Sequence, residues 1–259
     1  MILYGQYLRC LDRELNYAIY LSYQDLSSSL KPSFLYFSLL PKSIEFSVDD
    51  IVGMWISEGF VHGSSRDLEE LGREYYDELI LRNLIDPDIR YVDQNVCTMH
   101  DVVRSFAHYM ARDEALVAHS SSKIDIIDRL NSQKFIHRIS VESKGSESEQ
   151  LEWMSLQTQI SLRTLISVEP TKMKPGDSLV TFSSLRNLHV QDTNFDALAE
   201  SLVQLKHLRY LCIKYTDTSM LPENIGNKMK FLQYINLSYC KRLVKLPGSI
   251  GILRHLRLS

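Results

Sequence analysis

The stretch Leu208-Arg209-Tyr210-Leu211-Cys212-Ile213 places apolar side chains at its first, fourth and sixth positions. Further copies of this spacing follow one another along the second half of the chain: Leu162/Leu165/Val168 in loose register, Leu185/Leu188/Val190, Leu232/Ile235/Leu237, and Leu256 with Leu258 near the chain end. Their starts lie 23, 23, 24 and 24 residues apart, and Ile136/Ile139/Val141 form a weaker earlier copy. A fixed period of this length indicates one structural unit repeated along the chain.

The period lies within the 20 to 29 residues of a leucine-rich repeat, whose L-x-x-L-x-L core forms a short strand of a solenoid. Apolar anchors of the convex side recur in phase with the strands: Leu198 with Leu202, Leu221-Pro222 with Ile225, and Leu246-Pro247 with Ile250. Three residues past the last strand anchor stand Thr193, Thr216 and Cys240, small side chains able to bond the turning backbone. We therefore expect an α/β leucine-rich-repeat solenoid over residues 135–259, and we interpret it as an array cut one strand into a new unit.

Side chains between the apolar strand positions point away from the solenoid core. The predicted partner-binding concave face consists of Arg186, Asn187, His189, Arg209, Tyr210, Lys214, Gln233, Tyr234 and Asn236. Tyrosine and arginine are enriched among binding hot spots. We expect Tyr210→Ala with Tyr234→Ala to weaken partner binding without unfolding the repeats.

The first 112 residues have the helical spacing of a compact domain. Ser47-Val48-Asp49-Asp50 has the form of a capping box, and Gly59 stands where the helix that follows should end. Further helices are predicted over residues 33–40, from Leu68 through Leu71, Tyr75 and Leu79 to about Asn83, and around Val102 to Met110. Alternating residues between 84 and 99, around Asp93-Gln94-Asn95, predict a β wing. This order predicts a winged-helix domain over residues 1–112, so the fold class is α+β, with a linker over 113–134 that contains Ser120-Ser121-Ser122.

Composition excludes several classes of protein. The 259 residues are 44% hydrophobic and 24% charged, with a net charge of -3, as expected of a soluble globular chain and not of a nucleic-acid binder. No apolar run reaches the length of a membrane helix, and the start lacks a signal peptide, so the cytoplasm is expected, with the nucleus possible. The four cysteines lie far apart, which predicts buried thiols and no metal site.

Charge is distributed unevenly along the chain. Residues 1–120 hold 10 basic and 19 acidic side chains, a net of -9, and residues 121–259 hold 19 and 13, a net of +6. We expect an intramolecular contact between the acidic half and the basic half, at the helix around Glu69 to Glu78. The basic residues nearest to the boundary are Lys123, Arg129, Lys134, Arg138 and Lys144.

Three stretches of the first half resemble a known family. They are residues 21–26 (Leu-Ser-Tyr-Gln-Asp-Leu) with residues 30–41, then Trp55-Ile56-Ser57-Glu58-Gly59-Phe60-Val61, and finally Met99-His100-Asp101-Val102-Val103. In this order, and followed by leucine-rich repeats, they resemble the end of the nucleotide-binding (NB-ARC) module of plant NLR disease-resistance proteins. The resemblance covers roughly residues 15 to 259, and Met99-His100-Asp101 correspond to its MHD motif.

The resemblance implies a role in defence against pathogens. His100 would reach the β-phosphate of ADP and Asp101 would hold the resting arrangement, while the repeats would restrain the switch and bind a pathogen effector or a guarded host protein. The family's G-x-x-x-x-G-K-[ST] loop would lie upstream of Met1, so we expect an N-terminally shortened chain that binds no cofactor by itself. ADP or ATP would be bound by the full-length protein.

Other interpretations stay open. His100 and Asp101 have no recognisable Ser or Cys nucleophile beside them, so no catalytic residue is predicted and an enzyme is not expected. Asp101 could simply cap a helix, with His100 at the surface. The chain could be a leucine-rich-repeat interaction scaffold without a switch. A winged-helix DNA-binding protein is disfavoured by the acidic first half.

Overall fold

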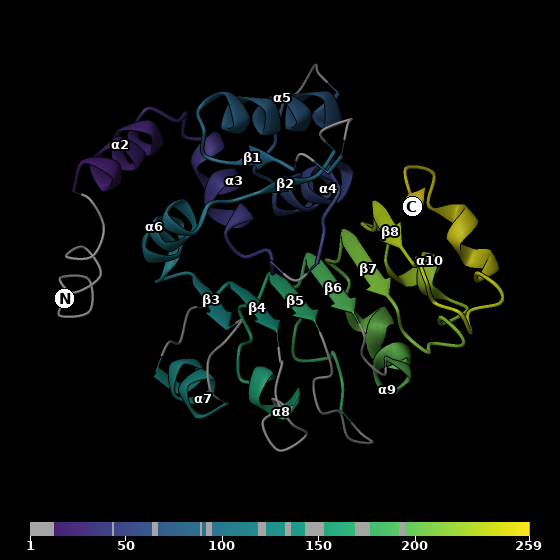
Figure 1. Ribbon diagram of the computed structural model, residues 1–259. Coiled ribbons are helices and arrows are strands. Elements are labelled where there is room, and N and C mark those ends of the chain that lie inside the picture. The colour runs from purple at the N-terminus through teal and green to yellow at the C-terminus, as the bar shows by residue number, and fades with distance from the viewer. Residues whose placement is uncertain are drawn as a thin grey trace. The chain divides into compact units, whose positions relative to one another are not determined.

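The computed structural model describes residues 13–42, 44–63, 67–88, 90–91, 95–118, 123–132, 136–142, 153–168, 177–191 and 195–258 (Figure 1). The chain divides into two compact units, residues 1–112 and 113–259. Each unit is described by itself below.

The first unit is a set of short helices with one small hairpin. Its helices are α2 (Arg13–Gln24), α3 (Leu30–Phe37), α4 (Val48–Glu58), α5 (Leu68–Leu81) and α6 (Asp101–Ala111). Helix α3 begins at Leu30, three residues before its predicted start. Tyr23, Phe34 and Phe106 bring α2, α3 and α6 together, with ring centroids 5.5 to 6.5 Å apart. Trp55 on α4 is fully buried, so the predicted apolar face of this helix is core.

Helix α4 begins and ends where the sequence predicts. The Ser47 hydroxyl accepts a hydrogen bond from the Asp50 amide at 3.2 Å, and Gly59 ends the helix at φ 86°. Helix α5 packs on α4 and buries Leu79, as predicted, together with Tyr76. The prediction was wrong for Tyr75, which is only half-buried and stands one residue before the buried Tyr76. Gly72 explains the close packing, because a Cβ atom there would lie 2.4 Å from Val52 Cγ1.

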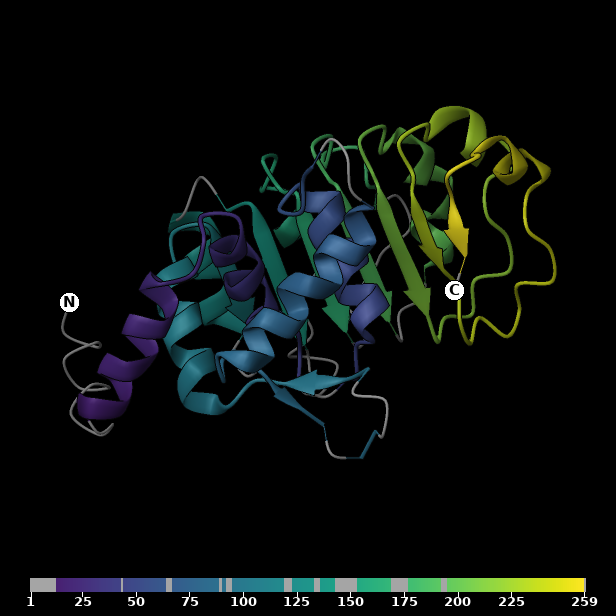
Figure 2. The same cartoon turned by 90° about the horizontal axis from the view of Figure 1, so that it is seen from above.

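The predicted wing is present as a short hairpin. Strand β1 (Asp86–Pro87) pairs antiparallel with β2 (Cys97–Thr98), and Figure 2 shows this hairpin beyond α5. Both strands lie within the predicted range of 84–99; residues 89 and 92–94 lie outside the described part of the chain. Pro87 lacks an amide proton for the ladder, which fits a strand that ends there.

The second unit is a parallel sheet built in chain order. Its seven strands are β3 (Ala115–Ala118), β4 (Arg138–Glu142), β5 (Thr164–Val168), β6 (Asn187–Gln191), β7 (Tyr210–Lys214), β8 (Tyr234–Asn236) and β9 (Arg257–Leu258), and each pairs with the next. Helices α7 (Lys123–Ser132), α8 (Trp153–Leu156) and α9 (Asp196–Ala199) lie along one face (Figure 1). The convex connections continue with η1 (Glu200–Gln204), α10 (Ile225–Lys228) and η2 (Gly248–Ile252). The predicted solenoid is confirmed.

Register decides which predicted anchors reach the core. Ile139, Leu165, Leu188, Leu211 and Ile235 are aligned across five strands, so the weak first copy is a true repeat. Val168 is the exception: it pairs with Gln191 and lies on the opposite face, while Ser167 takes the position of Val190. The loose fit of that copy therefore came from a serine at a core position.

The convex anchors form the other half of the core. Leu198, Leu202, Leu221, Ile225 and Ile250 belong to one buried cluster with the strand anchors, whereas Leu246 keeps 38% of its surface exposed. Cys240 donates from its thiol to the Ile213 carbonyl at 3.1 Å, and Thr216 lies 3.4 Å from the same sulfur. The bond from Cys240 is the expected one from a small side chain to the turning backbone, whereas Thr216 contacts the side chains of Thr218 and Cys240. Thr193 lies outside the described residues.

The segment predicted as a linker, residues 113–134, is instead part of the repeat unit where the structure describes it. Strand β3 pairs with β4 along four residues, and α7 contributes Ile126 and Leu130 to the common core. The apolar run Ala115-Leu116-Val117-Ala118 is too short for a periodicity argument, so only pairing with β4 reveals it as a strand.

Candidate functional site

A cavity of about 310 Å³ in the first unit gathers the three motif residues. It lies between the loop after α3, the hairpin and the start of α6, and Met99, His100 and Asp101 all line it. Met99 is buried and anchors the segment. His100 and Asp101 are exposed and follow one another at the first turn of α6.

His100 is the N-cap of α6. Its Nδ1 accepts a hydrogen bond from the Val102 amide at 3.3 Å. The alternative in which Asp101 caps the helix is therefore wrong. With Nδ1 accepting, a neutral ring carries its proton on Nε2, which makes Nε2 a donor. Asp101 instead forms an ion pair with Lys42, which comes from the loop after α3.

A buried cation forms part of the cavity wall. Arg104, one turn into α6, donates from Nη1 to the carbonyls of Ser38 at 3.2 Å and Leu40 at 2.8 Å. Burial lowers the pKa of Arg104 to about 10, so the guanidinium still carries its charge at neutral pH. Burial, followed by the charge of Arg104, also lowers the pKa of Lys42. His108 contacts the Ser38 carbonyl at 2.7 Å, so two basic side chains face the C-terminal end of α3, where carbonyls lack helical partners.

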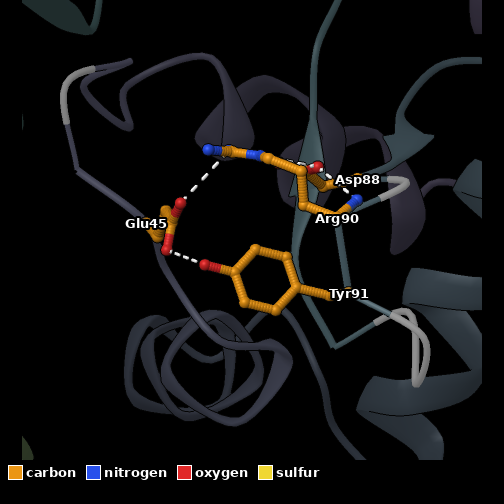
Figure 3. Close-up of polar contacts among 4 residues, drawn as sticks. All are labelled: Glu45, Asp88, Arg90 and Tyr91. Carbon is orange, nitrogen blue, oxygen red and sulfur yellow. Dashed lines mark hydrogen bonds and ion pairs between the residues drawn. The ribbon is translucent and has the colours of Figure 1, made fainter.

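On another side of the cavity, Arg90 is held by two carboxylates (Figure 3). Its Nη2 lies 2.5 Å from Asp88 and 3.1 Å from Glu45, and the Tyr91 hydroxyl donates to Glu45. The bond to Arg90 lowers the pKa of Asp88 and raises that of Arg90, while the bond to Glu45 raises the pKa of Tyr91. The cavity thus combines three cations and one imidazole donor with three carboxylates.

The described residues offer no metal centre in this cavity or elsewhere, because no group of three His, Cys, Asp or Glu side chains is clustered there. Cys97 lines the cavity, and burial raises the pKa of its thiol to about 11, so it is a poor nucleophile at neutral pH. Across the described part of the chain, Cys97, Cys212 and Cys240 form no disulfide. Cys10 lies outside that part.

The predicted concave-face residues come from three neighbouring strands and the positions just before them. Asn187, Tyr210 and Tyr234 are register partners on β6, β7 and β8, and the Tyr210 and Tyr234 rings lie 6.2 Å apart. His189, Lys214 and Asn236 share their face by alternation with the core anchors. Arg186, Arg209 and Gln233 directly precede the strands. Their backbones link neighbouring repeats, because the Arg209 amide donates to the Arg186 carbonyl and the Gln233 amide donates to the Arg209 carbonyl.

Exposure corrects the expectation that all nine residues form an open surface. Asn187, His189, Tyr210 and Asn236 are buried in the structure. Arg186, Arg209, Lys214, Gln233 and Tyr234 are half-buried.

Two tyrosines next to this face were missed by the sequence analysis. Tyr215 and Tyr239 follow β7 and β8, are 47% and 63% exposed, and stack in parallel at 4.4 Å between ring centroids. Both have positive φ angles, 53° and 64°, a conformation that is unfavourable for a bulky residue. The signal was present, since the two tyrosines stand 24 residues apart and just before Thr216 and Cys240.

Two family models match the two units. "Disease resistance protein Winged helix domain" covers residues 39–107, and "Leucine-rich repeat region" covers residues 161–258. Among curated proteins, probable disease resistance protein RF9 of Arabidopsis thaliana is 27% identical over 86% of this chain and 22% of its own length. Probable disease resistance RPP8-like protein 4 of the same plant is 29% identical over 88% of this chain and 26% of its own length. Tomato (Solanum lycopersicum) ToMV susceptible protein tm-2 is 28% identical over 92% and 28%.

The chain therefore has a disease-resistance winged-helix domain followed by a leucine-rich-repeat region, and over most of its length it is similar to plant disease-resistance proteins. It spans about a quarter of the length of the curated relatives that it matches. The cavity belongs to the region that matches the disease-resistance winged-helix domain, because all of its lining residues except Phe37 lie within residues 39–107. Among the described residues, no helix is both long enough and apolar enough to cross a membrane.

The sequence analysis found the motif side of this cavity and missed the opposite wall. Met99, His100 and Asp101 were recognisable as a motif, but Lys42, Arg90 and Arg104 have no common spacing. Lys42 follows Leu40-Pro41 in one of the family stretches, and that position was the available signal. Arg90 and Arg104 reach the cavity only through folding.

Proposed function

We propose that this chain is the switch-and-recognition part of an intracellular plant immune receptor. Its winged-helix domain senses the bound nucleotide, and its repeats recognise a protein partner and restrain the switch. The observation that carries the proposal is the position of His100, which caps α6 at the edge of a cavity that also holds Lys42, Arg90 and Arg104.

The geometry of His100 supports contact with a phosphate. Because Nδ1 accepts from Val102, Nε2 is left as the donor, and a phosphate oxygen is an acceptor. The start of α6 adds the partial positive charge of a helix N-terminus. Asp101 pairs with Lys42, which links the motif to the loop after α3 and supports a role in holding one arrangement of the domain.

The nucleotide itself requires a phosphate-binding loop, and the cavity residues alone are a weak substitute. We therefore expect residues 1–259 to bind ADP weakly or not at all. The informative protein is a chimera in which the part of an Arabidopsis relative that precedes the matched region is joined to residues 13–259. ADP affinity of the purified chimera is measured by calorimetry.

His100→Ala in the chimera should weaken ADP binding by about 10- to 100-fold, the effect of losing one hydrogen bond to a charged group. The control is His62→Ala, because His62 is exposed and lies outside the cavity lining. An ADP affinity unchanged by His100→Ala would contradict nucleotide sensing and favour a repeat scaffold without a switch. Micromolar ADP binding by residues 1–259 alone would contradict the need for the loop.

Partner recognition is proposed for the concave face and the adjoining tyrosine pair. Tyr234 is half-buried and Tyr239 is exposed, so both can be replaced at lower cost to the fold than the buried Tyr210. With an identified effector or host protein, Tyr234→Ala plus Tyr239→Ala should weaken binding at least about tenfold, as for aromatic hot spots. Binding within twofold of the unaltered chain would remove this face as the recognition surface.

A further inference from the structure

Three successive turns of the repeat unit have the same geometry and similar chemistry. Each turn precedes a strand and is closed by a backbone hydrogen bond of 3.1 Å, from Leu208 to Leu205, from Leu232 to Met229, and from Leu256 to Leu253. The two residues inside each turn are a basic residue and a ring residue: Lys206-His207, Lys230-Phe231 and Arg254-His255. All six are exposed. Repetition of the turn therefore places a column of cations beside a column of rings.

The two preceding turns lack this chemistry. They are closed by the same kind of bond, from Leu162 to Gln159 and from Leu185 to Phe182, but they contain Ile160-Ser161 and Ser183-Ser184. The basic and aromatic columns are therefore a feature of the last three turns and not a requirement of the solenoid.

A hollow of about 580 Å³ opens between the last two of these turns, and we name it the rim pocket. It is lined by Gly226, Asn227, Lys230, Phe231, Leu232, Gln233, Ile252, Leu253, Arg254 and His255. Phe231 is 56% exposed and its ring stacks on His207, with centroids 6.2 Å apart and planes 11° apart. Ile252 is 58% exposed. The rim pocket thus combines large apolar side chains with a basic border.

Its charge is one-sided. Lys230 and Arg254 are cations, His255 stands beside Arg254, and none of the ten lining residues is Asp or Glu. Lys206 on the preceding turn adds a third cation next to His207. An occupant that complements these groups carries carboxylates around an apolar side chain. The volume suits one large side chain with its neighbours, within the range of small-ligand pockets.

We propose that the rim pocket binds an acidic segment of a partner protein, with one aromatic or large aliphatic side chain of that segment seated against Phe231 and Ile252. Carboxylates on either side of this side chain pair with Lys230 and Arg254. Of the nine residues assigned to the concave face, only Gln233 also lines this site, and the proposed contacts with Lys230, Phe231, Ile252 and Arg254 do not depend on that face. A nucleic acid is a poorer match, because a phosphate backbone needs a longer basic track than three turns provide.

The test is a selection from a displayed library of random twelve-residue peptides, with immobilised residues 1–259 as bait. A second bait carries Lys230→Glu and Arg254→Glu. A third bait carries Lys241→Glu and Arg242→Glu, which changes the net charge equally at exposed residues outside the pocket. The best peptide is then synthesised, and its dissociation constant is measured at about 0.05 and 0.5 M salt, a range over which screening becomes severe.

The expected peptides carry Asp or Glu on both sides of Trp, Phe or Leu. Their binding should weaken at least tenfold with Lys230→Glu and Arg254→Glu and with Phe231→Ser, change less than twofold with the Lys241 and Arg242 control, and weaken with salt. Thermal unfolding of each variant verifies that the fold is intact. Enrichment of no peptide, enrichment of neutral or basic peptides, or an equal loss with the control would overturn the proposal. The proposal would also be overturned if an oligothymidylate bound more tightly than the peptide and if Lys230→Glu with Arg254→Glu abolished that binding, because the pocket would then be a nucleic-acid site.

Discussion

The winged-helix unit and the repeat unit stabilise their backbones by different means. In the first, side chains of Ser47, Asp67 and His100 cap α4, α5 and α6. In the second, α9, η1, α10 and η2 have no side-chain cap. Their ends are instead held by bonds repeated from turn to turn. Side-chain caps therefore mark the start of three helices of the first unit, although not of α3, whereas periodic contacts define the solenoid.

The largest expected effects concern one tryptophan in each unit. Trp55 and Trp153 are both fully buried, and Trp153 also donates to the Ser178 carbonyl and meets the Phe182 ring edge-on at 5.6 Å. Trp55→Ala and Trp153→Ala should each lower the free energy of unfolding of their own unit by about 3 to 5 kcal/mol. In each variant, fluorescence of the remaining tryptophan follows the unaltered unit during denaturant unfolding. Equal losses in both units would show that the chain unfolds as one cooperative body, and the comparison would fail.

A pair of glycines tests how far repeats depend on their neighbours. A Cβ atom on Gly226 would lie 1.8 Å from the Ser249 carbonyl oxygen of the next repeat, while one on Gly251 would have no neighbour within 4 Å. Gly226→Ala should destabilise the repeat unit by about 1 to 3 kcal/mol through overpacking. Gly251→Ala, the matched control, should change it by less than about 0.5 kcal/mol. Calorimetric melting that shows the same loss for both would contradict close packing between α10 and η2.

The caps offer a smaller contrast. Ser47→Ala removes the bond to the Asp50 amide and should cost the winged-helix unit about 1 kcal/mol. Asn224 stands at the corresponding position of α10 but makes no capping bond. Asn224→Ala should therefore lower the free energy of unfolding of the repeat unit by only a few tenths of about 1 kcal/mol. Chemical denaturation curves measure both. A loss at Asn224 as large as that at Ser47 would mean that local caps matter equally in the two units.

The smallest expected effect concerns attraction between the units. With the boundary at Arg112, residues 1–112 contain 10 basic and 17 acidic side chains, and residues 113–259 contain 19 and 15, so the charges are still opposite. The two parts should associate weakly at low salt and less at 1 M, because exposed ion pairs contribute about 0 to 1 kcal/mol each. Sedimentation of separately expressed units measures this. Of the basic residues named for the contact, Arg138 already pairs with Glu114 at 3.1 Å, and Lys134 and Lys144 lie outside the described residues.

That measurement has its own control. Glu69→Gln with Glu70→Gln on α5 should weaken the association, whereas Glu200→Gln with Glu223→Gln in the repeat unit should leave it unchanged or strengthen it. An association indifferent to salt would remove the electrostatic contact.

The repeats and the capping of α4 could be predicted from sequence because their partners lie at fixed separations. The sheet register aligns Ile139, Leu165 and Leu188 on neighbouring strands, and the Ser47 hydroxyl accepts a hydrogen bond from the Asp50 amide within one turn. Predictions of burial or of the core-facing side were wrong where the neighbouring residue takes the core position, as for Tyr75 and Val168. They also failed for β3, whose four residues carry no period.

The sequence by itself determined the repeat period, the family stretches and the identity of Met99-His100-Asp101, because each is a pattern within a short window. Only the tertiary structure decided that His100 and not Asp101 caps α6, that Lys42 pairs with Asp101, and that Arg104 reaches the Ser38 and Leu40 carbonyls. The physical reason is separation along the chain. Arg104 lies 66 residues from Ser38, and no rule of spacing links them. Their contact exists because α3 and α6 pack together in one aromatic core.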